Sequence, residues 1–238
     1  MHKRILLSFF VFSTLFVSAQ PPGYMGKRVS LVYQNFIFPS LTPNSSRSSV
    51  NISHNAELNC VTGKRSALCF TFLYVPIKVK NSTYSYSQLI NSTGNKDYFN
   101  LNSFAYALGL KLFFSRNKFA PLGGYVKWEL EYSRAILNID EYSVLSSSHP
   151  SSFSEIKYPA HKMVVQGGGP AISFGKQRIF FNKLIVDYGV RAAIIVAWNT
   201  DGFINNTSYE NSFDTKVSNI VLTQQLINAR IGIGFLAF

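Results

Sequence analysis

The stretch from Leu101 to Arg116 alternates between bulky apolar residues and small or polar ones, and this pattern limits the possible folds more than any other feature. The bulky set is Phe104, Tyr106, Leu108, Leu110, Leu112 and Phe114. The intervening set is Ser103, Ala105, Ala107, Gly109, Lys111 and Ser115. Because alternate residues of a strand point to opposite faces, the pattern predicts a long β-strand with one apolar face and one polar face.

Seven further stretches resemble this one, so the chain reads as all-β with eight strands. The other strands are expected at about 27–34, 52–62, 67–79, 125–141, 161–175, 183–198 and 217–238. Short turns near 63–66, 117–123 and 176–182 alternate with long connections near 35–51, 80–100, 142–160 and 199–215. This alternation predicts an antiparallel up-and-down transmembrane barrel, with short turns at one rim and long loops at the other. Within the sixth strand, Gly167 to Pro170 predicts a bulge or bend.

The N-terminus has the parts of a secretory signal peptide. Lys3 and Arg4 form a positive start, an apolar run covers Ile5 to Val17, and small residues follow at Val17-Ser18-Ala19. The run is too short to be a spanning helix. We therefore expect residues 1–19 to be cleaved and residues 20–238 to form one exported barrel domain.

Charges on the polar faces indicate which side of the sheet meets lipid. They lie at mid-strand and comprise Arg28, Glu57, Lys111, Lys127, Glu129, Glu131, Asp187, Arg191 and Arg230. Side chains just fill the interior of an eight-stranded barrel, so we expect these residues to form a lumen charge network. The aromatic residues expected to form outward girdles at the membrane interfaces are Tyr125, Trp128, Tyr132, Tyr188 and Trp198. A soluble, lipocalin-like barrel with its apolar face inward is the alternative.

The formal charge of +12 is high for the chain's length. A basic balance can indicate nucleic acid binding. An exported chain meets lipid phosphates and anionic glycolipids instead, so we expect contact with outer-membrane lipids, both phospholipid and lipopolysaccharide, and none with nucleic acid.

Both ends of the expected barrel resemble a known family. Three segments carry this resemblance: the signal end Val17-Ser18-Ala19-Gln20, the segment from Gly23 to Arg28, and the closing run from Ala229 to Phe235 with Phe238. Through them, the chain resembles small outer-membrane β-barrel proteins of the porin-like, OmpA/OmpX-type class, as found in Bacteroidetes. The resemblance implies a bacterial outer-membrane location, with both termini periplasmic and the long loops extracellular. It also implies that barrel-assembly machinery reads a terminal signal formed by Ile231, Ile233, Phe235 and Phe238. Strict alternation puts Phe238 on the opposite face from the other three, which a bulge or frayed end near 236–237 would repair.

The family is functionally diverse, so the resemblance suggests a location more than an activity. We expect a non-enzymatic structural or interaction protein, or an accessory subunit of a larger outer-membrane complex. A narrow pore for small solutes is one alternative. A lipid A-modifying enzyme is another, since His149 and Ser151 are spaced like the His-x-Ser pair of lipid A deacylases, although here they lie in a Ser- and Pro-rich loop.

No residue pattern calls for a cofactor or a metal. The histidines do not have the spacing of a metal site. Cys60 and Cys69 flank a tight turn and an exported chain can form disulfides. Their positions, however, fall on opposite faces of the two strands, which favours two unbridged packing cysteines over a disulfide.

Overall fold

The structure, a computed structural model, describes residues 26–39, 50–80, 98–114, 120–139, 142–149, 152–158, 161–201 and 225–237. The expected signal peptide, residues 1–19, lies outside these ranges, as does Phe238. The signal peptide and the part of Phe238 in the assembly signal therefore remain predictions from the sequence. No helix within the described ranges is long and apolar enough to cross a membrane.

Strands make up almost all of the described chain. They are β1 (Val29–Pro39), β2 (Val50–Val61), β3 (Ser66–Lys80), β4 (Tyr98–Phe113), β5 (Gly123–Ile139), β6 (Tyr142–His149), β7 (Ser152–Tyr158), β8 (His161–Phe180), β9 (Leu184–Ala193), β10 (Val196–Asp201) and β11 (Ile227–Ala237). The final strand begins at Ile227, because Gln225 and Leu226 form a turn and a bend. Of the expected start of that strand, 217–224 falls outside the described residues.

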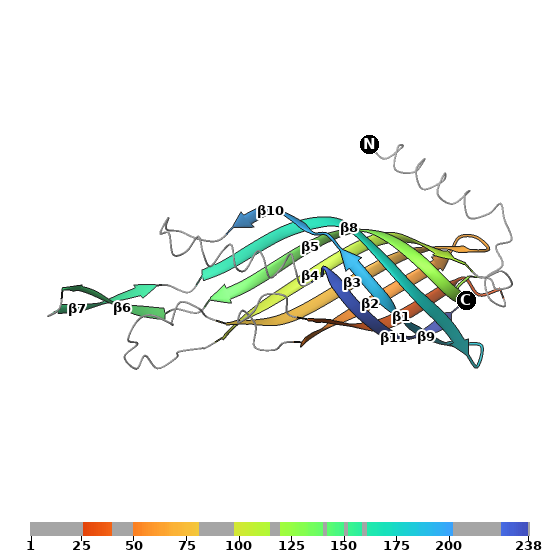
Figure 1. The fold of residues 1–238 in the computed structure, drawn as a ribbon, viewed down its shortest axis with the longest axis horizontal. Coiled ribbons are helices and arrows are strands. Elements are labelled where there is room, and N and C mark those ends of the chain that lie inside the picture. Colours follow the sequence, from red (N-terminus) through yellow and green to blue (C-terminus); the bar gives the residue numbers. More distant parts are fainter. Residues whose placement is uncertain are drawn as a thin grey trace, which may run out of the picture.

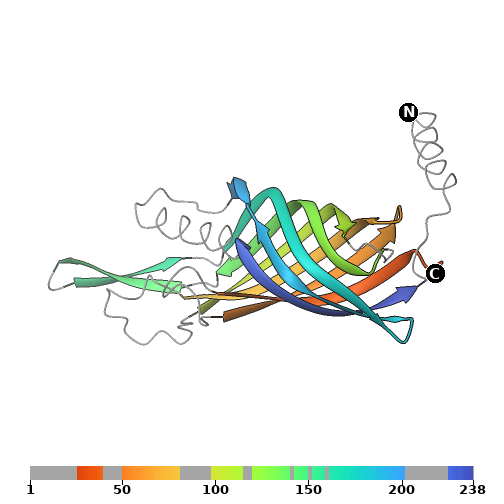
Figure 2. The ribbon, with the colours of Figure 1, turned by 45° about the vertical axis from the view of Figure 1, so that its right-hand side comes forward.

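The sheet closes on itself, as the sequence predicts (Figures 1 and 2). Each strand pairs antiparallel with its neighbour, and β1 pairs with β11 from Val29↔Ala237 to Ile37↔Ala229. β9 and β10 are successive segments that both pair with β8, so together they count as one strand of the barrel. The barrel is therefore eight-stranded and up-and-down. The register between β1 and β11 is regular up to Ala237, so the bulge expected near 236–237 is absent from the described part of that strand.

The irregularity expected at Gly167 to Pro170 lies on the neighbouring strand instead. β8 runs unbroken through Pro170, whereas Ile194 and Ile195 separate β9 from β10. There the backbone N–H of Ile194 donates to the carbonyl of Pro170 at 3.0 Å. Because proline has no N–H to return, the ladder is incomplete at this point and the facing strand is the one that is interrupted.

The connections alternate in length around the barrel. The short ones are 62–65, 114–122 and 181–183, and the long ones are 40–49, 81–97, 140–160 and 202–226. The turn expected at 176–182 is tighter than predicted, because β8 continues to Phe180. Phe181 and Asn182 then take left-handed conformations, with φ of 51° and 60°, in a turn of only three residues, 181–183. The connection expected to be a plain loop at 142–160 contains the hairpin β6–β7 (Figure 1).

The barrel interior is layered along its axis. An apolar cluster, which includes Phe36, Leu73 and Met163, fills the end nearest the long connections. Smaller clusters around Phe113 and around Ile185 fill the end nearest the short turns. Buried charged residues occupy the middle. Apolar clusters therefore lie on both sides of the charged middle of the lumen, and buried polar residues such as Ser53 and Ser30 share their levels.

Candidate functional site

Eight of the nine residues expected in the lumen charge network are buried in the barrel. They are Glu57, Lys111, Lys127, Glu129, Glu131, Asp187, Arg191 and Arg230. Arg28, the ninth, is exposed. It lies before β1 begins, where its carbonyl accepts a hydrogen bond from the N–H of Val61 at the rim. Inward alternation on β1 starts at Ser30, so the position of Arg28 at the rim leaves its side chain in solvent.

Glu57 lies at the centre of the network. Its two carboxylate oxygens accept from different lysines, Oε1 from Lys111 Nζ at 2.5 Å and Oε2 from Lys127 Nζ at 2.6 Å. All three side chains are fully buried. These lysines come from β4 and β5, so this carboxylate of β2 joins strands that do not neighbour its own.

A second part of the network surrounds Glu129. Lys127 Nζ lies 2.8 Å from Glu129 Oε1, which also accepts from the hydroxyl of Thr71 at 2.9 Å. Arg191 donates from Nε to Glu129 Oε2 at 3.3 Å and pairs through another guanidinium nitrogen with Glu131. Gly109 faces Glu129 directly, and a Cβ there would lie 2.7 Å from the Glu129 Cγ. A small residue at that position therefore makes room for the long side chain.

Tyr125 belongs to this interior and was wrongly expected in an outward girdle. Its side chain is fully buried, and its hydroxyl donates to Asp187 at 2.7 and 2.9 Å from the two carboxylate oxygens. The reason is parity, since Tyr125 shares its face with Lys127 and Glu129. Gly175, paired with it on β8, leaves space for the ring.

Asp187 and Arg230 complete the network. Arg230 lies 3.7 Å from Asp187 Oδ1 and 5.1 Å above the Tyr125 ring, and Lys111 lies 3.7 Å from Asp187 Oδ2. The network thus holds four acidic and four basic side chains, so its formal charges cancel. Buried ions are tolerated only when they are paired in this way, because removing one partner leaves an uncompensated charge in a low-dielectric interior.

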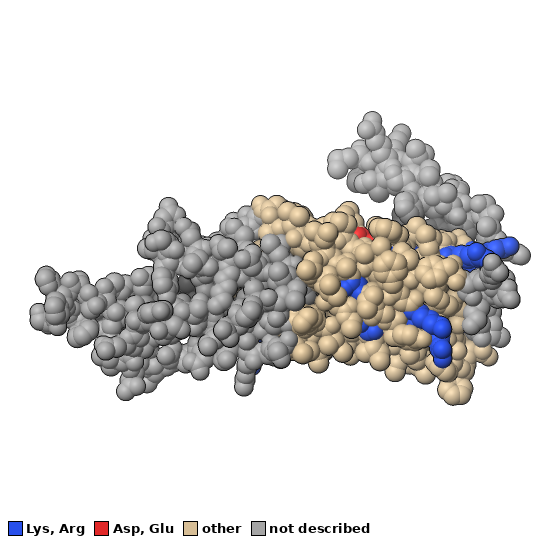
Figure 3. Space-filling model, in the orientation of Figure 1, with Lys and Arg blue, Asp and Glu red and all other residues tan. Residues whose placement is uncertain are grey.

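The outer wall has the opposite character. The remaining girdle residues, Trp128, Tyr132, Tyr188 and Trp198, point outward and are 39–60% exposed. Ile231, Ile233 and Phe235 also point outward, while Phe238 lies outside the described residues. Wherever the structure describes side chains, every Asp and Glu is buried, whereas basic residues such as Lys78 are exposed. Figure 3 shows this surface, on which the basic areas exceed one small acidic area.

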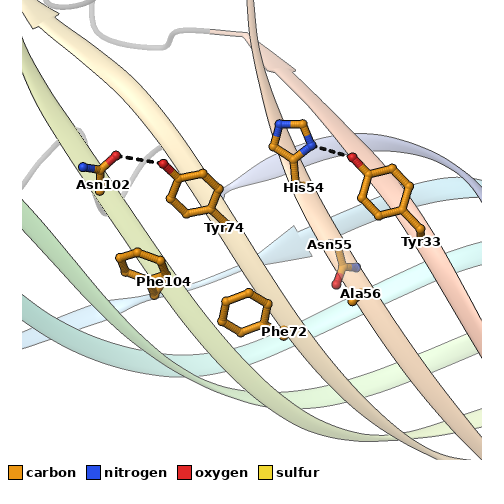
Figure 4. A pocket seen from close by; sticks show the side chains of 8 residues that line it. All are labelled: Tyr33, His54, Asn55, Ala56, Phe72, Tyr74, Asn102 and Phe104. Atoms are coloured by element: carbon orange, nitrogen blue, oxygen red, sulfur yellow. Dashed lines mark hydrogen bonds between the residues drawn. The ribbon is translucent and has the colours of Figure 1, made fainter.

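A groove of about 440 Å³ lies on the outer wall across β1 to β4 (Figure 4). It is lined by Tyr33, His54, Asn55, Ala56, Phe72, Tyr74, Asn102 and Phe104. Rings follow one another across the strands: the centroids of Tyr33 and His54 lie 6.2 Å apart, those of His54 and Tyr74 6.4 Å, and those of Tyr74 and Phe104 5.1 Å. We did not predict this groove. The outward parity of His54, shared with Ile52 and Leu58, is the sequence signal that points to it.

The cysteines are free and lie on different faces. Cys69 is buried and donates from its thiol to Asn59 Oδ1 at 2.9 Å, while Cys60 is half-buried on the outer face. Among the described residues, no group of three His, Cys, Asp or Glu side chains could hold a metal ion. His149 lies on β6, whose side chains are outside the description, as is Ser151.

Comparisons with known proteins yield only distant likenesses. No protein-family model matches the chain, and no curated protein matches it significantly. Among solved structures, it is similar to the N-terminal β-barrel domain of Pseudomonas aeruginosa OprF, with 10% identity, 88% of this chain and 97% of that chain covered, and a TM-score of 0.31. It is also similar to Acinetobacter baumannii CarO, with 12% identity, 87% of this chain and 97% of that chain covered, and a TM-score of 0.38. The likeness to Yersinia pestis Ail in complex with a heparin analogue has 8% identity, 88% of this chain and 96% of that chain covered, and a TM-score of 0.36. At these values the likenesses carry no weight for function.

Proposed function

We propose that the chain is a transmembrane barrel of the bacterial outer membrane. The outward face of β4 supports this proposal, because it is apolar from Phe104 to Phe114. This run matches the ~9–11 residues with which a tilted strand crosses a bilayer. An exterior of this kind on a soluble protein would be a large exposed apolar patch. A soluble barrel with its apolar face inward does not fit, since Leu108 is 57% and Leu130 70% exposed.

The barrel is closed to ions and does its work through its surfaces. The buried, charge-balanced network around Glu57 carries this proposal, together with the apolar clusters on either side of it. A protein of this kind is a non-enzymatic structural or interaction protein, or a subunit of a larger outer-membrane complex. Its short turns and termini lie in the periplasm and its long connections outside. The outward Ile231, Ile233 and Phe235 form the part of the assembly signal on which the barrel-assembly machinery acts.

The conductance of single barrels tests this proposal. We expect the purified full chain in a planar bilayer of phosphatidylcholine and phosphatidylglycerol to give no steady current steps at 100 mV. Insertion is checked in parallel by protease protection in vesicles of the same lipids. Steady, uniform channels from inserted protein would contradict a closed lumen.

A narrow pore for small solutes is the second candidate. One observation favours it: several buried polar atoms of the lumen make no hydrogen bond among the described residues, including the guanidinium nitrogens of Arg230 and the Nε2 of Gln34. Such groups can be satisfied by water. In that case Arg230→Ala would change the conductance or its ion preference. In a closed barrel, neither the wild-type protein nor this variant conducts. The lipid A-modifying enzyme remains a hypothesis that rests on the sequence spacing of His149 and Ser151.

A further inference from the structure

The groove of Figure 4 lies where the outer wall changes from apolar to polar. Towards the short turns, the outward residues next to it are apolar, as Leu108 on β4 shows. Towards the long connections they are polar on β3 and β4, with Lys78 and Asn100 exposed. On β1 and β2 the apolar character continues further, to Ile37 and to Val50. On the proposed function, this boundary is the level at which lipid headgroups meet acyl chains.

One hydrogen bond in the groove leaves a donor at its polar edge. The Tyr74 hydroxyl donates to Asn102 Oδ1 at 3.0 Å, so the Asn102 amide keeps its NH₂ group to donate. Tyr33 Oη lies 2.5 Å from His54 Nδ1 and donates its proton to Asn35 Oδ1 at 3.2 Å. The polar edge of the groove therefore suits a ligand rich in acceptor oxygens.

Charge on the surrounding wall favours an anionic ligand. Arg134 on β5 pairs directly with Phe104, which lines the groove, and its side chain is exposed. Lys78 on β3 and Lys162 on β8 are exposed nearer the long connections. Every described acidic side chain is buried, and Figure 3 shows only one small acidic area on this surface. A phosphate combines negative charge with several acceptor oxygens, and guanidinium groups bind it through paired hydrogen bonds.

The floor of the groove is apolar, so we expect the ligand to have an aliphatic part as well as a phosphate. Ala56, Phe72 and Phe104 present carbon surface between the polar edge and the apolar band. We propose that this groove binds one lipid A moiety of lipopolysaccharide, with an acyl chain along Phe72 and Phe104 and a phosphate held by Asn102 and Arg134, which lie on neighbouring strands. This proposal rests on the proposed outer-membrane location, because it places the long-connection rim in the outer leaflet.

Native mass spectrometry of the full chain in dodecyl maltoside micelles tests the proposal. Bis-phosphorylated lipid A is the probe, and fully dephosphorylated lipid A and phosphatidylglycerol are the competitors. We expect one lipid A to be retained and the dephosphorylated form to bind about tenfold more weakly, as the loss of one charge-assisted contact predicts. Equal retention of either competitor would overturn the assignment.

Variants separate the groove from the rest of the wall. We expect Arg134→Gln and Asn102→Ala each to weaken lipid A retention about tenfold, while Lys176→Gln and Tyr188→Phe, exposed elsewhere on the wall, leave it unchanged. Arg134 is an exposed residue, so its variant should fold even if the Asn102 variant does not. Unchanged retention in Arg134→Gln would contradict the proposed site. If the wild-type chain inserts into vesicles but retains no lipid A, this inference alone fails; if it does not insert, the outer-membrane proposal fails as well.

Discussion

The inner and outer walls of this barrel are made by the same strands, yet they differ in every physical property. On β5, Glu129 is 5% exposed and paired with Lys127 and Arg191, whereas the adjacent Trp128 and Leu130 are 57% and 70% exposed. In a water-soluble protein, charged side chains face the solvent and large apolar ones face inward. The inversion is what an apolar surrounding, as in the proposed outer-membrane location, requires, and the charges are accommodated inside by pairing with each other.

A second difference concerns the balance of charge. The inner wall carries equal numbers of acidic and basic residues, while the exposed charged side chains of the described outer wall are all basic. Pairing is required inside because an unpaired ion there is costly. Outside, near the rims, basic residues need no partner from the protein, since anionic headgroups can supply one. Within the described residues, the excess positive charge thus lies on the exterior.

Loss of the central carboxylate of the inner wall should have the largest effect. Glu57→Ala leaves Lys111 and Lys127 without their shared partner, and we expect it to lower the free energy of unfolding by about 3–5 kcal/mol. Urea unfolding in vesicles, followed by the shift in electrophoretic mobility, measures this change. Adding Lys111→Met should recover part of the loss, because it removes one unpaired charge. A single variant as stable as wild type would show that water reaches these lysines.

A charge placed on the outer wall should be nearly as harmful. We expect Leu130→Arg to destabilise the barrel in vesicles by about 2–4 kcal/mol, as Arg does near the bilayer midplane. Asn138→Arg, exposed on the same strand near the long connections, should cost only about 0–1 kcal/mol. Equal and small effects at both positions are what a water-exposed wall would give.

Removal of one hydrogen bond from the inner wall should have the smallest effect of the three. Tyr125→Phe takes a donor from the buried Asp187 carboxylate, and we expect a loss of about 1.5–3 kcal/mol in the same unfolding assay. Tyr188→Phe is the matched control on the outer wall, and it should change stability by less than about 0.5 kcal/mol. A larger loss in the control would contradict the assignment of the two faces.

Much of the fold could be predicted because alternation in a strand is local. Each strand of the barrel carries its own period-2 pattern, so the faces of Leu108 and Lys111 follow from position alone. The same rule, applied consistently, places Tyr125 inside with Lys127. The girdle prediction for Tyr125 was wrong because tyrosine is typical of membrane interfaces, whereas the parity of this residue directs it into the lumen. Arg28 shows the complementary limit, since parity holds only within a strand and this residue lies just before one.

The candidate sites depended on contacts that no local pattern contains. Whether Lys111 and Lys127 share Glu57 is decided by the register of three strands and by the inclination of side chains across the lumen. The groove of Figure 4 required His54 to lie between Tyr33 and Tyr74, which only strand pairing sets. The break between β9 and β10 likewise appears on the strand that faces Pro170 and not on the one that contains it.

Tryptophan fluorescence tests most directly whether the outer wall meets lipid. The chain has two tryptophans, Trp128 and Trp198, and both lie on that wall, 57% and 60% exposed. With the full chain inserted in phosphatidylcholine vesicles, we expect brominated acyl chains to quench the emission strongly and aqueous iodide to quench it weakly. Strong quenching by iodide, with little effect of bromination, would contradict a lipid-facing outer wall.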